Sequence, residues 1–129
     1  MAVEAAERIA RLQLARSERI GPVTFAQLIA RYGSAQAALD ALPGVIRKAG
    51  GAAYTAAPRD RIEAEIASGE ALGARLVVIG DADYPETLAA VDPAPPVLWA
   101  RGSLDALQKE AVAICLLYTS PSPRDRTRS

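Results

Sequence analysis

The fold is decided by the stretch Asp81-Ala-Asp-Tyr-Pro-Glu-Thr-Leu-Ala-Ala-Val-Asp-Pro-Ala-Pro-Pro-Val-Leu-Trp-Ala-Arg-Gly102, in which turn residues alternate with short apolar runs. Tyr84 precedes a proline and is expected to be extended, whereas Pro85 suits the first turn of a short helix that reaches Val91. The prolines that follow exclude a helix and lead into an apolar run at 97–99, which predicts a buried strand. The stretch therefore predicts the front edge of an α/β domain, and it contains no catalytic motif.

The residues before this stretch predict a helix and a strand. Residues 58–73 have helical periodicity, with Ile62, Ile66 and Gly69 on one stripe. Residues 75–80 form a continuous apolar run, which is typical of a strand covered on both faces of a parallel sheet. A further strand-like run covers 110–114. The order helix, strand, short helix, strand, strand is the order in which a Rossmann-like sheet begins.

Three amphipathic helices are predicted ahead of that helix, and they can share one small core. The first covers about 3–16, and the second has apolar residues at i, i+3, i+4 and i+7 from Phe25 to Tyr32. Gly33 is placed to end the second helix and Ser34 to cap the start of the third. The third helix has the same apolar spacing, and Pro43-Gly44 is expected to stop it before a loop at 44–57.

The link between the first two helices, Ser17-Glu-Arg-Ile-Gly-Pro-Val-Thr-Phe25, partly resembles a helix-hairpin-helix. Backbone N–H groups at the start of a helix can bind a DNA phosphate, although Pro22 removes one donor here. A tight packing turn is the favoured interpretation, because glycine turns between helices are common on packing grounds alone. For the alternative, DNA binding, the expected contact residues are Arg19, Gly21, Thr24 and Arg31.

Composition excludes several classes of function. The 129 residues carry no net formal charge, with three arginines against one aspartate in the last six residues, so no global basic field indicates nucleic-acid or membrane binding. One cysteine and no histidine exclude a zinc set and the catalytic groups that depend on histidine. We expect neither metal nor cofactor. No signal peptide or membrane span is apparent, which predicts a cytoplasmic protein.

Four polar or aromatic side chains near the predicted strand ends are candidates for a site. Asp81 and Asp83 follow the first strand and could serve as metal or acid–base carboxylates, but a solvated turn is the favoured interpretation because aspartate is a common turn residue. Trp99 is expected in the core, with contact to a partner as the alternative. Arg101 is expected on the surface or in a salt bridge rather than on a phosphate.

Between Arg11 and Ile114 lies a series of short motifs whose order and spacing are informative together. Its members are Ile20-Gly-Pro-Val-Thr-Phe25, Leu28, Tyr32-Gly33-Ser34, Ala37-Ala38-Leu39, Leu42-Pro43, Asp83-Tyr84-Pro85, Leu88, Pro96-Val97-Leu98, Arg101-Gly102 and Ala111-Val-Ala-Ile114. Together they resemble the front of the DprA (Smf) family, the DNA-processing proteins of bacterial transformation. Each motif is weak alone, and the combination is fairly specific.

The resemblance implies a SAM-like helical domain before an extended Rossmann domain that forms a homodimer. It also implies binding of single-stranded DNA and loading of RecA onto the strand, without enzymatic turnover. In the family, Val-Ala-Ile is followed by Val-Gly-Ser-Arg, which begins a glycine-rich phosphate-binding loop. Here residues 115–129 form a string rich in Ser, Pro and Arg that we expect to be disordered and foreign, like adaptor read-through. No DNA-binding residue of the family maps onto this sequence.

We therefore interpret the chain as an α/β fragment, with a SAM-like helical domain at 1–70, a truncated Rossmann-like start at 71–114 and a non-native tail at 115–129. The parent protein is expected to bind single-stranded DNA and load RecA, and the fragment is expected to be inactive. Two alternatives stay open. A Rossmann-like nucleotide or nucleoside-phosphate hydrolase needs a downstream glycine-rich loop with a catalytic Glu/Arg pair, and a free-standing helical DNA-binding module needs a basic face.

Overall fold

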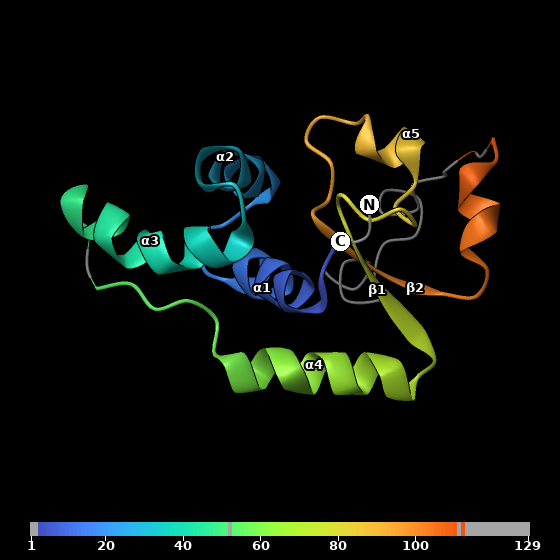
Figure 1. The fold of residues 1–129 in the computed structure, drawn as a ribbon, viewed down its shortest axis with the longest axis horizontal. Coiled ribbons are helices and arrows are strands. Elements are labelled where there is room, and N and C mark those ends of the chain that lie inside the picture. The colour runs from blue at the N-terminus through green and yellow to red at the C-terminus, as the bar shows by residue number, and fades with distance from the viewer. Residues whose placement is uncertain (1–2, 52, 111, 113–129) are drawn as a thin grey trace, which may run out of the picture.

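The computed structural model of the chain describes residues 3–51, 53–110 and 112 (Figure 1). Its elements in chain order are α1 (Ala5–Arg16), α2 (Pro22–Tyr32), α3 (Ala35–Lys48), α4 (Arg59–Ala71), β1 (Ala74–Val78), α5 (Glu86–Ala89), β2 (Val97–Arg101) and the 3₁₀-helix η1 (Leu104–Gln108). Figure 1 shows α1–α3 gathered on one side, β1, β2 and α5 on the other, and α4 leading from the first group to the second. Across the described residues, every helix is too short or too polar to cross a bilayer.

The core of the helical part is built from the apolar stripes that the helical periodicity predicts. Its buried residues are Ala10 and Leu14 of α1, Phe25 and Leu28 of α2, and Ala35, Ala38, Leu39 and Leu42 of α3. Burying a side chain such as that of Phe25 contributes about 1.5–3 kcal/mol relative to leaving it in water. Three of the core residues, Ala10, Ala35 and Ala38, are alanines, whose small side chains let the helix axes approach closely.

The turn between α2 and α3 has the caps that the sequence predicts. Gly33 is left-handed, with φ of 83°, and its N–H donates to the carbonyl of Ile29, which ends α2. The Ser34 side chain accepts a hydrogen bond of 3.1 Å from the N–H of Ala37, which satisfies one free donor at the start of α3. Both predictions are confirmed.

The prediction that Pro43-Gly44 stops α3 is wrong, because the helix runs through both residues to Lys48. A proline inside a helix costs about 3 kcal/mol, since it removes one backbone hydrogen bond. Pro43 is exposed, so its ring lies on the solvent side of α3, and Ile46 in the next turn packs against the core. The helix ends only where Gly51 donates back to the carbonyl of Ile46.

The mixed α/β class, with helices first and a sheet after them, is confirmed. The two described strands pair antiparallel, with Leu76 opposite Trp99 and Val78 opposite Val97, so the expectation of a parallel pair is wrong. A parallel pair needs a crossover that covers the sheet, usually a full helix, whereas the only helix between β1 and β2 is the four-residue α5. The predicted strand at 110–114 and the tail at 115–129 lie outside the described residues apart from Glu110 and Val112.

An ion pair with a buried carboxylate joins α1 to the turn after β1. The Asp81 side chain is 6% exposed and accepts hydrogen bonds from both terminal nitrogens of Arg8 and from the N–H groups of Val3 and Val78. Arg8 also donates to the carbonyl of Leu76 at 3.2 Å. The prediction of a solvated turn is therefore wrong for Asp81, because the helix packed against the strand supplies partners that only the fold brings there.

A second connection joins α1, α4 and β2 through Glu65. This carboxylate accepts hydrogen bonds from Arg16 at 2.9 and 3.0 Å and from the Trp99 indole at 2.8 Å. The hydrogen bond from Arg16 is the main reason that the pKa of Glu65 lies below its ordinary value, and the indole contributes as well. The half-buried Trp99 ring lies over Gly69, so a side chain at Gly69 would overlap it. Trp99 thus packs on α4 of its own chain.

We expect Asp81→Asn to lower the free energy of unfolding by about 2 kcal/mol at neutral pH, because it leaves the guanidinium of Arg8 without its anion. Burial raises the pKa of Asp81, but the hydrogen bonds from Arg8, Val78 and Val3 outweigh burial and hold it below its ordinary value. The stabilisation is therefore complete above about pH 4 and is lost as the pH falls further.

Urea unfolding between pH 2 and pH 7 measures this loss. The matched control is Asp83→Asn, whose side chain is 47% exposed in its pair with Arg75 and should change stability little. Equal effects of the two substitutions would contradict a special role for the Arg8–Asp81 pair.

A second expectation concerns Gly69→Ala. Alanine favours a helix over glycine by about 1 kcal/mol, yet the added methyl group would displace the Trp99 ring and break its bond to Glu65. We expect a net loss of about 1–2 kcal/mol and a shift of tryptophan emission, since Trp99 is the only tryptophan. A rise in the thermal midpoint would contradict this expectation, because it would show that the Trp99 ring moves aside without a loss of stability.

Candidate nucleic-acid interface

The turn between α1 and α2 ends in an open helix N-terminus. Arg19 takes the left-handed conformation, with φ of 66°, whereas Gly21 is extended, with φ of −92° and ψ of −179°. A Cβ at Gly21 would have no atom within 4 Å, so neither backbone strain nor packing requires glycine there. Because Gly21 has no side chain, the backbone at the start of α2 is accessible from solvent.

In the first turn of α2, two backbone N–H groups have no acceptor among the described residues. Gly21, as N-cap, has no side chain to accept them, and no acidic residue lies in the first turn. Pro22 has no N–H and the N–H of Phe25 already donates to the carbonyl of Gly21, which leaves those of Val23 and Thr24 at the helix end. The positive end of the helix dipole is thus free to attract an anion.

The linker before α4 holds this turn from behind. The buried hydroxyl of Ser17 donates to the carbonyl of Gln13 at 2.7 Å and accepts from the N–H of Ala57 at 3.0 Å. The hydroxyl of Tyr54 donates to the carbonyl of Glu18 at 2.7 Å. Burial raises the pKa of Tyr54 above its ordinary value, so the phenol stays protonated and remains a donor at neutral pH. The turn is therefore fixed on one side and open on the other.

The structure brings three of the four predicted contact residues together. Arg19, Gly21 and Thr24 lie at the N-terminal end of α2, with Arg19 exposed and Thr24 half-buried. Arg31 lies in the last turn of α2, about 15 Å from Gly21 at 1.5 Å per residue. Thr24 and Arg31 are seven residues apart and so share one face of the helix. A strand that contacted all four would have to follow the length of α2.

A groove lies at that far end, between α2 and α3. Its volume is about 480 Å³, and its lining residues are Arg31, Tyr32, Ala41, Gly44, Val45, Lys48 and Ala49. The guanidinium carbon of Arg31 lies 5.3 Å from the centroid of the Tyr32 ring. Helical spacing in the sequence places Tyr32 on the apolar face of α2, and it does not relate Lys48 to Arg31. The available signal was that two consecutive helices each end in basic residues.

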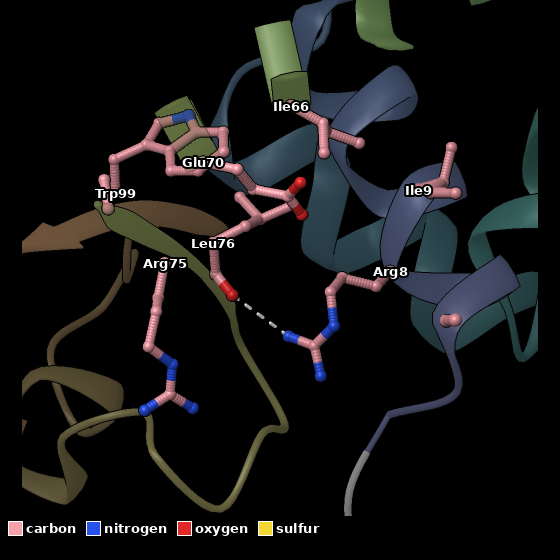
Figure 2. Close-up of a pocket in the computed structure, with 9 residues that line it drawn as sticks. Arg8, Ile9, Ile66, Glu70, Arg75, Leu76 and Trp99 are labelled. Atoms are coloured by element: carbon pink, nitrogen blue, oxygen red, sulfur yellow. Dashed lines mark hydrogen bonds between the residues drawn. The ribbon is translucent and has the colours of Figure 1, made fainter. Parts of the chain in front are cut away.

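A second cavity, of about 450 Å³, lies between α1, α4 and the β1–β2 pair (Figure 2). Figure 2 shows Ile9 and Ile66 on one wall, and Arg8 bonded to the carbonyl of Leu76 across the space. Arg75 extends away from Glu70 and pairs instead with Asp83. The cations near this cavity are therefore engaged within the protein. Within the described part of the chain, no three metal-ligating side chains gather at one place.

We expect Ser17→Ala to loosen the turn, because the N–H of Ala57 would lose its acceptor beside a buried position. The expected loss is about 1–2 kcal/mol of unfolding free energy, measured by urea titration. Hydrogen exchange should be faster at Ala57, and at Ile20, whose N–H donates to the carbonyl of Ser17, than in the unsubstituted chain. Ser34→Ala, which removes a helix cap at another turn, is the control and should leave exchange at Ala57 unchanged.

Two family models match consecutive parts of this chain. The DprA-like N-terminal HHH domain matches residues 5–68, which contain α1, α2, α3 and all of α4 except its last turn. The DNA recombination-mediator protein A model matches residues 75–115, which begin inside β1. No individual protein of curated function matches the sequence.

Proposed function

Because the chain belongs to the DNA recombination-mediator protein A (DprA) family, we propose that its helical part contacts the phosphate backbone of single-stranded DNA through the turn at 17–24. The observation that carries this proposal is the open N-terminus of α2 beside Gly21, where no side chain caps the helix. A phosphate there would accept from the N–H groups of Val23 and Thr24. Arg19 would add a cation next to them.

The proposed contact is a positioning contact rather than a sequence-reading one. Phosphate contacts fix the position of a strand and carry no information about its bases. Contact with the backbone alone would let a DNA recombination mediator bind strands of any sequence, which suits the family that this chain matches. We further propose that the complete protein works as a homodimer that hands the strand to RecA without chemical turnover. These partners follow from the family resemblance.

We propose that this surface is auxiliary, because its charge is low. The chain has no net formal charge, and the Coulombic part of strand binding scales with the phosphates that are neutralised. One phosphate on a helix N-terminus and one neighbouring arginine cannot supply micromolar affinity. The helical part would then orient a strand that a further part of the complete protein holds more tightly.

The expected dissociation constant for oligothymidylate at physiological salt is about 0.1 mM or weaker, with a slope of roughly 0.7 in log affinity against log salt for each phosphate contact. Gly21→Asp should abolish binding at this turn, because a carboxylate at the N-cap occupies the same donors and repels phosphate. The open space at Gly21 admits the side chain, so the variant should be as stable as the parent or more so.

Gly21→Asn is the matched control, because it caps the same donors without adding charge and should weaken binding less. Arg19→Ala should lower both the affinity and the salt slope. Titration of a labelled oligonucleotide, followed by amide chemical shifts at Val23 and Thr24, measures these effects. Unchanged shifts at both residues in the presence of millimolar oligonucleotide would contradict the proposal.

A further inference from the structure

The groove between the C-terminal ends of α2 and α3 is made by an unusual position in α3. Gly44 lies inside this helix, where glycine is less favourable than alanine, and a Cβ there would have no atom within 4 Å. Ala41 and Val45, on the same face, are also small. No packing requirement of the described residues explains the glycine, and its effect is to deepen the groove.

The walls of the groove have one sign of charge. Arg31 and Lys48, both exposed, come from the last turns of α2 and α3, and none of the lining residues is acidic. Both cations line the same opening. Cations in the last turn of a helix are favoured by its dipole, but that effect does not require a groove between them.

One wall also presents a stacked pair. The guanidinium carbon of Arg31 lies 5.3 Å from the centroid of the half-buried Tyr32 ring, which is close enough for a cation–π contact. Proteins bind the bases of single strands by stacking them on aromatic rings and on arginine planes. Stacking tolerates any base, which is the requirement for binding without sequence preference.

We propose that this groove binds one nucleotide of a single strand, with the base stacked on the Arg31–Tyr32 pair above Gly44 and the phosphate held by Lys48. A volume of about 480 Å³ lies within the range of small-ligand sites. The inference rests on the proposed function, because it adds a second contact on the same strand about 15 Å from the start of α2. The two contacts use different residues and can fail separately.

The test uses the whole chain and an oligothymidylate of ten nucleotides, with amide shifts followed at Gly44 and at Thr24. Gly44→Leu fills the groove, keeps every charge and has no clash at the first added carbon, so the unfolding midpoint should stay the same or rise. We expect the shifts at Gly44's neighbours to disappear and the affinity to fall about fivefold, as for the loss of a weak stacking contact.

Lys48→Ala and Arg47→Ala form the matched pair for charge. Both remove one cation from the last turn of α3, but only Lys48 lines the groove. Lys48→Ala should weaken binding more than Arg47→Ala by about threefold, a difference that a general loss of charge would not produce.

The outcomes separate the two proposals. Loss of affinity in Gly44→Leu, with shifts at Thr24 retained, supports the groove. Unchanged affinity in Gly44→Leu, with binding lost in Gly21→Asp, overturns the groove and leaves the turn as the DNA contact. Shifts at Gly44 without shifts at Thr24 support the groove and contradict the turn, and the absence of shifts at both positions overturns both.

Discussion

The ion pair between Arg8 and the buried carboxylate of Asp81 is the constraint on which the arrangement of the described elements depends. Asp81 lies in the turn that follows β1, and its carboxylate is satisfied by a guanidinium from α1 and by backbone N–H groups. A buried carboxylate without those partners would be costly, so β1 keeps its place only while α1 lies beside it. The bonds from Arg16 and Trp99 to Glu65 connect α1, α4 and β2 in the same way. The helices and the strand pair therefore support each other.

This mutual support explains why the candidate interface is fixed on one side and open on the other. The linker reaches the turn through Ser17 and Tyr54, both of which bond to backbone groups of other segments. The opposite side carries Gly21 and the first donors of α2, which nothing in the described chain covers. A surface that binds a DNA backbone through fixed N–H donors needs this combination. If the donors were mobile, ordering them on binding would cost conformational entropy and weaken the affinity.

Local rules predicted much of the fold from residues alone. Helical spacing identified the buried residues of α2 and α3, and Gly33 and Ser34 end and begin helices as their chemistry requires. The rules were wrong at Pro43, where packing of Ile46 on the core outweighs the local cost of proline. For the candidate interface, the sequence identified the glycine and the basic residues, but it could not predict which of them lie together in space. Arg31 lies far from Gly21 and lines the same groove as Lys48, and no spacing rule relates residues of different helices.

What the sequence determined by itself was the class of fold, the helical core and the family, because these follow from periodicity, turn chemistry and short motifs along the chain. Only the tertiary structure decided that β1 and β2 run antiparallel, that Asp81 is buried, and that a groove lies between the ends of α2 and α3. Each of these depends on contacts between residues far apart in the chain. Their energies depend on burial and on partners that local sequence does not specify.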